Sequence, residues 1–476
     1  MLLLSKQDLL HSNRHRELNK MKLSTAAIPI LKLAIPLIVI QLCQASLGLM
    51  DSLIAGRYHF QDLAAIGLGS NLWTPVGILI TGILYVLVPR ISALVAGTAD
   101  KRADELVDLR VEGEKLAWLA GLTALLVVQL LGLLPPLLIE DTRVAGITTR
   151  YLQFAALSMP GFALFVMYRF LCEGHSQLIP VLLTALILAV FNPLLNVVLV
   201  NGLYGLPEMG GAGCGIATAV STWIAAAIMR TACKRQLPQL FAPVRRVRAE
   251  ENAWKKLLGH GLPIGVSLVL EVLALTALAI LAAQLGTRVI AAHQIAINIA
   301  IMIFMIPVAM SSAATIRVAF YRGKEDVTGL HKTAGAVMLI AAGYGAVMTV
   351  AILVVGDRFL NLFSHDQQVI AIVSGLLLFI AAFQLLDAIQ ITAAGVLRGM
   401  EEYVKPLIVV LAIYWGLVIP LGYIIGVKGW LLDYSGINTI WFMLSVGLSI
   451  AAFVLSYQSM QTLKNFSLSR VEVATT

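Results

Sequence analysis

The chain alternates between long apolar stretches and short polar segments. A helix of about 20 apolar residues is long enough to cross the hydrocarbon core of a bilayer. Twelve stretches meet this requirement, at about 29–54, 61–88, 116–139, 151–172, 179–200, 212–233, 257–284, 289–315, 334–355, 369–397, 406–427 and 437–460. The pattern predicts an all-α polytopic membrane protein with twelve transmembrane helices.

Composition and charge agree with a chain embedded in a lipid bilayer. Of the 476 residues, 59% are hydrophobic and 13% are charged, whereas soluble proteins have about 45–50% and about 25%. The net charge of +8 would suit a nucleic-acid-binding protein, but the basic residues alternate with the apolar stretches and form no continuous patch. We therefore expect no nucleic-acid partner.

The basic residues predict how the chain is oriented. With the N-terminus in the cytoplasm, 28 of the 34 Lys and Arg residues fall on the inner side, as the positive-inside rule requires. The others are Arg57, Arg143, Arg150, Arg288, Arg358 and Lys428. We expect a multi-pass protein of the cell inner (plasma) membrane with both termini in the cytoplasm.

A weak repeat divides the chain into two halves. Four sets of matching residues are separated by 227 positions: Pro36 and Pro263, Ala64-Ala65 and Ala291-Ala292, Asn71 and Asn298, and Arg90 and Arg317. Six helices return a chain to its starting side, so the halves would be related by a pseudo-two-fold axis along the membrane normal. The predicted order is a cytoplasmic segment 1–27, an N-lobe 28–236, a linker 237–256, a C-lobe 257–462 and a cytoplasmic tail 463–476.

Two six-helix bundles related in this way are typical of secondary transporters, in which the bundles rock around a central cavity. A static channel built from two duplicated halves is the alternative. Pro36 and Pro263 lie early in the first helix of each half. Because proline removes a helical hydrogen bond, both are candidate bending elements, although fixed kinks would also explain them.

Three carboxylates, Asp51, Glu271 and Asp387, lie inside apolar spans that contain no nearby Lys or Arg to neutralise them. An ionisable group in a membrane span is costly and is usually functional. We predict that these acids couple transport to protons or cations. The alternatives are a protonated acid that only packs helices for Glu271, and an aspartate that meets lipid headgroups for Asp51.

Several side-chain amides accompany these acids. Gln384 and Gln390 each lie three residues from Asp387, which clusters polar groups near one helix face. Hard carboxylate and amide oxygens suit a sodium ion, so Glu271 and Asp387 could bind Na⁺ together or share protons. Further supporting polar residues are Asn192 and Asn196, which share one helix face and could bond to an acid or only join helices, and Asn298.

Motifs for cofactor chemistry are missing from the sequence. It contains no Walker A loop, dinucleotide-binding glycine motif, HExxH or nucleophile elbow in a suitable context. We therefore expect no enzyme activity and no cofactor, and an ion gradient as the energy source. The four cysteines lie in or beside spans without CxxC spacing and are expected to be apolar filling.

As a set, several sequence strings resemble the multidrug and toxic compound extrusion (MATE) family, especially its NorM-type bacterial branch, over residues 25–460. They are LAIP at 33–36, GLMDSLIAG at 48–56, GLPEMGGAGCGIAT at 205–218, VIAAHQIAIN at 289–298, IRV at 316–318, FQLLDAIQITAAGVLRG at 383–399 and Tyr414-Trp415. The resemblance implies a role for Asp51 in proton or substrate coupling. It also implies a cation-binding C-lobe around Glu271 and Asp387, amide partners for Asp51 at Asn192 and Asn196, and bending at Pro36.

One position departs from that family. NorM-type proteins have a tyrosine four residues before the tenth-helix aspartate, and Phe383 stands there in this chain. The missing hydroxyl weakens a sodium assignment and leaves H⁺ and Na⁺ as alternatives. We expect a monomeric antiporter that exports amphipathic, often cationic, organic compounds and confers antibiotic resistance. The alternatives are a flippase for lipid-linked precursors, disfavoured because no Arg or Lys lies in mid-span, and a passive channel.

Overall fold

The computed structural model describes residues 6–97, 102–242, 253–356, 358, 360, 366–430 and 436–475, and these contain helices and turns but no strand. Eleven helical segments are long and apolar enough to cross a membrane, and a bent helix pair supplies a twelfth. The predicted all-α architecture is therefore confirmed. Half of the linker expected at 237–256, residues 243–252, lies outside the described residues.

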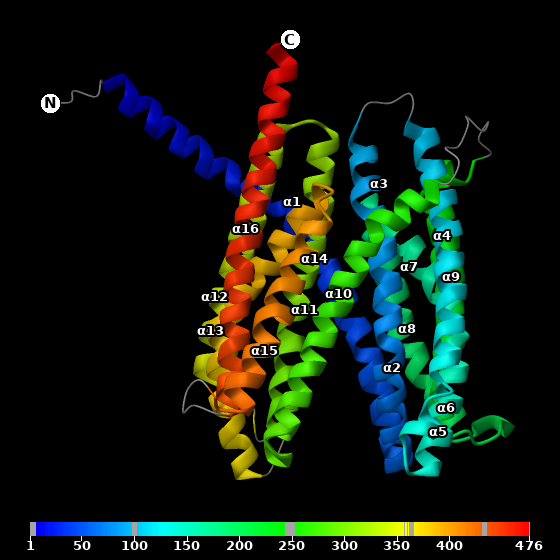
Figure 1. Cartoon of the computed structure of the whole chain (residues 1–476). Helices are drawn as coiled ribbons and strands as arrows, with labels where there is room; N and C mark the ends of the chain where they lie inside the picture. The colour runs from blue at the N-terminus through cyan, green and yellow to red at the C-terminus, as the bar shows by residue number, and fades with distance from the viewer. Residues whose placement is uncertain are drawn as a thin grey trace.

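The first half of the chain forms one bundle, which we call the N bundle (Figure 1). Its elements are α1 (Lys6–Tyr58), α2 (Phe60–Tyr85), α3 (Leu87–Ala96), α4 (Arg102–Leu131), α5 (Pro135–Leu138), α6 (Thr142–Ala156), α7 (Ser158–Gly174), α8 (Leu178–Val200), η1 (Leu203–Gly205), α9 (Ala212–Gln236) and η2 (Pro238–Phe241).

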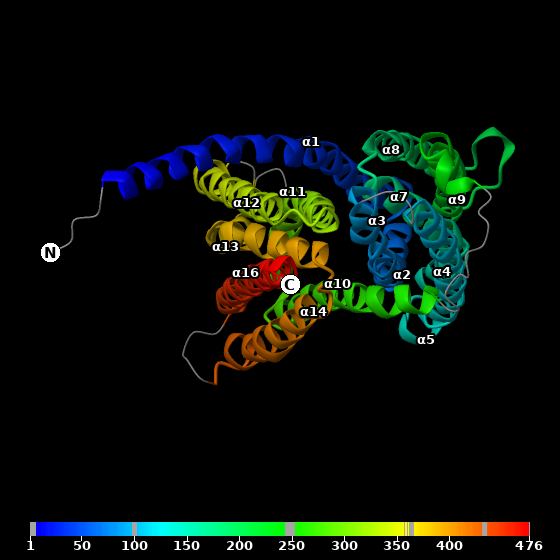
Figure 2. The same ribbon diagram turned by 90° about the horizontal axis from the view of Figure 1, so that it is seen from above.

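The second half forms the C bundle. Its elements are α10 (Ala253–Ala283), α11 (Thr287–Gly323), α12 (Val327–Val355), α13 (Gln367–Gly399), α14 (Val404–Val410), the π-helical η4 (Leu411–Val418), α15 (Ile419–Leu421), the π-helical η5 (Gly422–Val427) and α16 (Ile437–Thr475). Helix α1 packs against α8 of the N bundle and also against α11 of the C bundle, so it runs along both (Figure 2).

Two spans differ from the regular helices that the sequence predicts. The fourth, expected at 151–172, is a pair of helices, α6 and α7, bent by 44°. Pro160 lies in the first turn of α7, and because it has no N–H it cannot bond back to Ala156 and continue α6. The eleventh span is π-helical on both sides of the short helix that contains Pro420. By contrast, α1 and α10 continue through Pro36 and Pro263.

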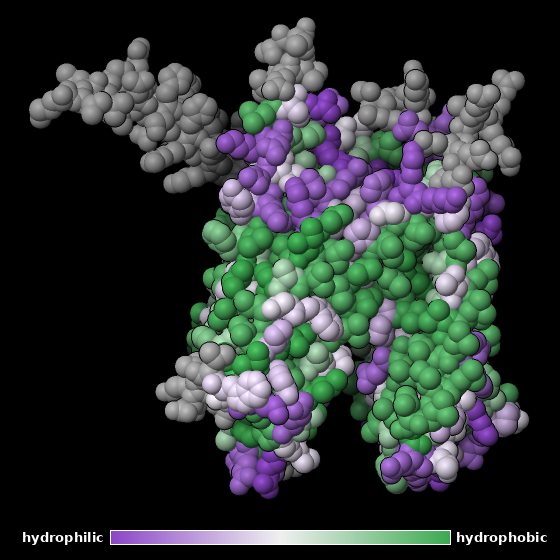
Figure 3. Space-filling view, viewed as in Figure 1, coloured by the Kyte–Doolittle hydropathy of each residue, from purple (hydrophilic) through white to green (hydrophobic). Residues whose placement is uncertain are grey.

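The two bundles touch at one end of the molecule and separate at the other. We call the end from which the C-terminus emerges the terminal side, and the opposite end the far side (Figure 1). Figure 3 shows the molecule hollowed between the bundles at the far side. On the terminal side, the hydroxyl of Ser92 in α3 donates to the carbonyl of Ile316 in α11 at 2.7 Å, which ties the bundles together.

Glycines make that closure tight. A Cβ atom added to Gly82 of α2 would meet the backbone of Gly265 in α10, and one added to Gly261 would meet the carbonyl of Ile83. Similarly, a Cβ on Gly323 of α11 would meet the backbone of Ala93 in α3. The helices therefore pack backbone to backbone, which only residues without a side chain allow.

On the face shown in Figure 3, a band of apolar side chains lies between the two polar ends of the molecule. Exposed apolar side chains on the spans include Leu126, Leu130, Val190 and Phe453, which are 62–75% exposed. Exposed apolar area of this extent would aggregate in water and marks a lipid-facing surface. The interior is close-packed, and Trp441 is its largest fully buried side chain.

Candidate functional site

The N bundle contains a hydrogen-bonded polar group around Asp51. The Nδ2 atom of Asn196 donates to Oδ1 of Asp51 at 2.6 Å and also lies 3.2 Å from Oδ1 of Asn192. Asn192 in turn donates to the hydroxyl of Ser221 at 3.4 Å. All four side chains are buried. The structure thus joins α1, α8 and α9 through one carboxylate, and it places both asparagines singled out in the sequence beside that carboxylate.

Aromatic residues enclose this group. The Tyr151 hydroxyl accepts a hydrogen bond from Nε1 of Trp73 at 3.0 Å and lies 3.4 Å from the hydroxyl of Ser70. Tyr151 is within electrostatic reach of Asp51. The Asp51 carboxylate is thus bonded to an amide and has the Tyr151 hydroxyl group within electrostatic reach.

The C bundle holds the other two acids. Asp387 on α13 is 8% exposed, and Glu271 on α10 is partly exposed. The two carboxyl groups are within electrostatic reach of each other, although α10 packs mainly against α2 and α14, and α13 against α11, α12 and α16. In the described part of the chain, neither acid has a hydrogen bond or an ion pair, so both carboxyl groups have coordination capacity left for a proton or a cation.

Of the three amides predicted to support these acids, two are buried near Asp387 and one is exposed. Gln384 and Gln390 are buried with Asp387, and Nε2 of Gln384 and Oε1 of Gln390 have no hydrogen-bond partner. Asn298 is exposed on α11, where its Oδ1 accepts a hydrogen bond from Gln294 at 3.3 Å. The structure therefore gathers the two glutamines near the acid, and no recorded contact brings Asn298 to it.

Phe383 packs on an aromatic group that the sequence analysis did not identify. Its ring stacks on Trp441 with centroids 6.3 Å apart, and Nε1 of Trp441 donates to Nδ1 of His293 at 3.1 Å. His293 is 1% exposed and its Nε2 has no partner. Because an ionisable residue inside a span is a functional signal, His293 on α11 could have been noted beside the three carboxylates.

A second missed residue is Asp62, which is 2% exposed at the start of α2. Its Oδ1 accepts a hydrogen bond from the backbone N–H of Gly211, at the N-terminus of α9. A carboxylate there complements the positive end of the helix dipole. In the sequence, this aspartate looks like an ordinary polar residue between two spans.

The described residues include no group of three or more His, Cys, Asp or Glu side chains positioned to hold a metal ion. Sodium needs only oxygen ligands, and carboxylates, amides and carbonyls can all supply them. Glu271, Asp387, Gln384 and Gln390 are such donors. Phe383 contributes no hydroxyl, whereas Tyr414 on η4 lies within electrostatic reach of both acids.

Comparison with known proteins identifies the family. The model of the MatE family matches residues 36–198 and 263–424. The chain belongs to the MatE family. It is 32% identical over 442 residues to the multidrug resistance protein NorM of Aliivibrio fischeri, which covers 90% of this chain and 93% of that protein. It is also 30% identical over 437 residues to the multidrug resistance protein MdtK of Cronobacter sakazakii, covering 90% and 94%.

Solved structures of MATE transporters share the fold of this MatE protein. The Vibrio cholerae MATE transporter VcmN in the bent form superposes with a TM-score of 0.81 at 18% identity, over 94% of this chain and 99% of that one. A multidrug resistance MATE family transporter in an outward-facing conformation gives 0.82 at 17%, over 93% and 97%. The resemblance stated from the sequence strings is therefore confirmed.

The match to the family model agrees with the internal repeat, because the model matches the chain twice. Its second matched segment begins 227 positions after the first, which is the separation at which residues such as Pro36 and Pro263 recur in the sequence. The weak repeat read from a few residues thus coincides with two copies of one family unit. Asp51 lies in the first copy, and Glu271 and Asp387 lie in the second.

Proposed function

We propose that this MatE protein is a secondary active multidrug efflux transporter of the cell inner membrane, which exchanges amphipathic, often cationic, organic compounds for H⁺ or Na⁺. The observation that carries the proposal is the placement of acids in both bundles, Asp51 in one and Glu271 with Asp387 in the other, in otherwise apolar spans. Relatives named multidrug resistance proteins NorM and MdtK support the class of substrate.

The positive-inside count supports an orientation with the terminal side in the cytoplasm. In that orientation, the hollow between the bundles opens to the outside, and the backbone contacts of Gly82, Gly261 and Gly323 close the inner side. The described arrangement then corresponds to the outward-open state of an alternating-access cycle. Opening the inner side requires those contacts to separate.

Exchange follows from competition for the acids. As a carboxylate, Asp51 attracts a cationic compound and accepts the hydrogen bond from Asn196. A bound proton removes that negative charge and weakens the attraction for the cation. By linkage, the ion drives export only if it binds the two states with different affinity, and the separation of the bundles supplies that difference by changing access to the acids.

The second acidic site leaves the identity of the ion to experiment. A pair of carboxylates within electrostatic reach shares protons readily, because two negative charges at close range oppose each other. The same pair with Gln384 and Gln390 offers oxygen ligands to sodium. Proton and sodium coupling therefore stay as equal alternatives in this proposal.

Transport of a fluorescent organic cation in proteoliposomes tests the function. A pH gradient and a sodium gradient are imposed separately on wild type and on the Asp51→Asn, Glu271→Gln and Asp387→Asn variants. The matched control is Glu325→Gln, which removes an acid of the turn between α11 and α12 that pairs with Arg470 of α16 at 2.9 Å. We expect one gradient to drive transport in wild type and control, and at least one variant in each bundle to lose the coupling.

The contrary result is equally specific. Cation movement that ignores both gradients would indicate a passive facilitator, and no movement of any organic cation would redirect the search to lipid-linked precursors. Full transport with normal ion dependence in Glu271→Gln and Asp387→Asn would remove the C bundle from the mechanism.

A further inference from the structure

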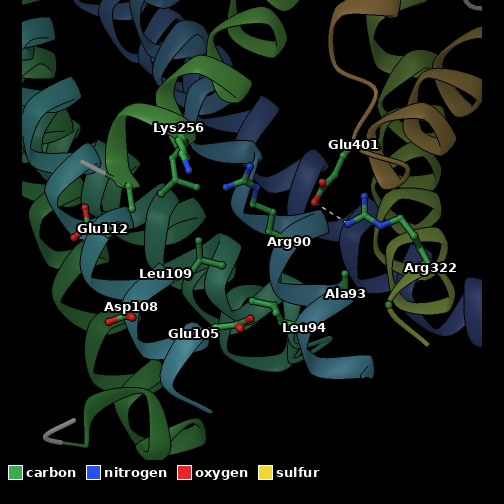
Figure 4. Close-up of a pocket in the computed structure, with 13 residues that line it drawn as sticks. Arg90, Ala93, Leu94, Glu105, Asp108, Leu109, Glu112, Lys256, Arg322 and Glu401 are labelled. Atoms are coloured by element: carbon green, nitrogen blue, oxygen red, sulfur yellow. Dashed lines mark hydrogen bonds and ion pairs between the residues drawn. The ribbon is translucent and has the colours of Figure 1, made fainter. Parts of the chain in front are cut away.

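A cavity of about 590 Å³ lies between the bundles on the terminal side, away from the hollow at the far side. Its walls come from α3 and α4 of the N bundle and from α10, α11 and the turn at Glu401 of the C bundle (Figure 4). The glycine-mediated backbone contacts separate it from the transport hollow. The cavity is therefore distinct from the coupling sites described above.

Some of the charged groups that line this cavity are already paired. Glu112 accepts from Lys115 at 2.6 Å and from the backbone N–H of Trp254 at 3.2 Å, which holds α4 to the start of α10. Arg322 forms an ion pair with Glu401 at 2.7 Å (Figure 4). These groups shape the walls, since each has its charge compensated inside the protein.

Other charged groups have capacity to bind a ligand. Arg90 on α3 donates to Nδ1 of His260 at 2.6 Å, and a guanidinium has five N–H groups to donate. A second cation, Lys256 of α10, lines the cavity beside Arg90 (Figure 4). The acids Glu105 and Asp108 lie three residues apart on one face of α4, and within the described residues neither acid makes a hydrogen bond or an ion pair. The cavity thus has cations on α3 and α10 and acids on α4.

Arg90, Glu105 and Asp108 of the cavity lie near the terminal-side ends of the candidate membrane spans Phe60–Ala96 and Ala103–Leu138, which is the level where lipid headgroups meet water. Figure 3 shows the polar band of the terminal side directly beyond the apolar band that faces lipid. Trp254, at the start of α10, is of the type enriched at membrane interfaces. Three leucines, Leu94, Leu109 and Leu257, line the cavity between its charged groups, and they provide apolar contacts for a glycerol backbone and the first carbons of acyl chains.

We propose that this cavity binds a zwitterionic phospholipid headgroup that carries a primary ammonium, as phosphatidylethanolamine does. The phosphate accepts hydrogen bonds from Arg90, and the ammonium donates to Glu105 and Asp108. Charge-assisted bonds of both kinds are stronger than neutral ones. A purely anionic headgroup would satisfy Arg90 but face the acids of α4, and a choline headgroup has no N–H to donate to them.

The position of the cavity gives binding a consequence for the transport cycle. Its walls belong to both bundles, so a headgroup that bridges them stabilises the arrangement in which the terminal side is closed. A ligand stabilises the state that binds it in proportion to its differential affinity. This consequence for transport depends on the proposed function, whereas lipid binding itself does not.

Native mass spectrometry of the purified full-length protein tests the binding directly. The protein in detergent is titrated with dioleoyl phosphatidylethanolamine, phosphatidylcholine and phosphatidylglycerol, and the retained lipid is counted for each. We expect preferential retention of one phosphatidylethanolamine molecule. Water-soluble phosphoethanolamine is the further probe, and we expect it to compete only at far higher concentration because it lacks the apolar contacts.

Variants assign the site. Arg90→Gln and the pair Glu105→Gln with Asp108→Asn should each weaken retention of phosphatidylethanolamine about tenfold, the effect of losing a charged hydrogen bond. Matched controls are Lys332→Gln, a half-buried cation on α12, and Asp104→Asn, on α4; both lie outside the cavity lining. The Tm of each variant without added lipid shows whether it is folded.

Three outcomes would overturn the proposal. They are equal retention of the three lipids, unchanged retention in folded cavity variants, and competition by soluble phosphoethanolamine as effective as that by the lipid. Loss of drug transport with lipid preference intact would contradict only the transport function, because the binding measurement involves no ion gradient.

Discussion

At the scale of single residues, Asp51 and Asn196 form the most direct contact between a predicted coupling acid and a predicted partner, at 2.6 Å. Both are buried, so a carboxylate that loses this bond is left without compensation for the water it gave up on folding. The position of each residue was visible in the sequence. Residue spacing alone could not pair them, because the contact joins residues 145 positions apart; the family resemblance did imply this pairing, and the contact agrees with it.

We predict that Asn196→Ala lowers the free energy of unfolding by about 1–3 kcal/mol, the cost of a buried group without its partner, and weakens ion-driven transport. The control is Asn201→Ala, which removes an exposed amide at the end of the same helix. Thermal unfolding in detergent and cation efflux measure the two effects. Equal effects in both variants would show that the bond to Asp51 has no special role.

The sequence alone does not distinguish a side chain that takes part in function from one that only packs helices. His293 stands beside another polar residue, Gln294, in the string VIAAHQIAIN, and nothing in that string sets it apart. The structure shows that it accepts a hydrogen bond from Trp441. From the sequence, Phe383 is notable only because it lacks the hydroxyl group of the tyrosine that NorM-type proteins have at this position. Its stacking on Trp441 gives the aromatic ring a packing role that no spacing in the sequence reveals.

At the scale of helices, the number and position of the spans could be predicted, because an uninterrupted run of about 20 apolar residues is the length that a helix needs to cross a bilayer. The breaks could not be located. Proline at 160 and at 420 was visible, but many prolines lie within intact helices here, including Pro36 and Pro263. Whether a proline ends a helix depends on tertiary packing that can satisfy the freed carbonyl.

The contact of α2 with α10 leads to a prediction at this scale. Gly265→Ala places a Cβ against the carbonyl of Leu79, so it should push the helices apart on the terminal side and cost about 1–3 kcal/mol, as overpacking does. Gly259→Ala is the matched control on the same helix, because nothing lies within 4 Å of its added Cβ. Spin labels on the two helices would report the separation.

We expect longer and broader distances in Gly265→Ala and wild-type distances in Gly259→Ala. The shift should favour the state open on the terminal side and slow the return of the empty transporter. Identical distance distributions in the two variants would mean that the helices tolerate the methyl group, and would contradict the tight closure.

The start of α13 gives a pH-dependent prediction. The backbone N–H of Gln368 donates to Asp366 at 2.8 Å and Arg288 lies 3.1 Å from it; these bonds hold the pKa of the Asp366 carboxyl below its ordinary value. The depressed pKa contributes stability above the unfolded-state value of about 3.9, and that contribution is lost as the pH falls through the lower, folded value.

Accordingly, Asp366→Ala should lower Tm at pH 7, and the difference from wild type should shrink towards pH 3. Asp366→Asn keeps a side chain that can cap the helix and should lose less. Thermal unfolding across this pH range provides the measurement. A difference from wild type that is constant with pH would show that the charge of Asp366 is not involved.

At the scale of the whole molecule, the orientation is testable. If the terminal side is cytoplasmic, Tyr204→Cys, at a residue 91% exposed on the far side, should react with an impermeant maleimide in intact cells. Lys332→Cys, on the opposite side, should react only after the membrane is opened. Cys172, Cys214 and Cys233 are buried and Cys43 is half-buried, so wild type provides the background. The reverse pattern would invert the topology.

Two-fold organisation of the molecule was predictable, because a duplicated unit leaves matching residues at a constant separation. The state of the molecule was not predictable. The hydrophobic pattern specifies which residues form membrane-spanning helices, and it does not specify how two bundles of such helices are placed relative to each other. The choice depends on short-range contacts such as Ser92 with Ile316, which involve residues of no unusual type.

The backbone contacts between the bundles have a further consequence. Side chains at an ordinary interface change rotamer and let two surfaces slide by small steps, but Gly82, Gly261 and Gly323 have no rotamers to change. A slight separation therefore loses the van der Waals contact at once and leaves a gap too narrow for water. The lost contact and the empty gap both make partly separated bundles unfavourable. The barrier on the terminal side should therefore open in an all-or-none manner, and a transporter that switches in this way gives ions no path to leak across the membrane.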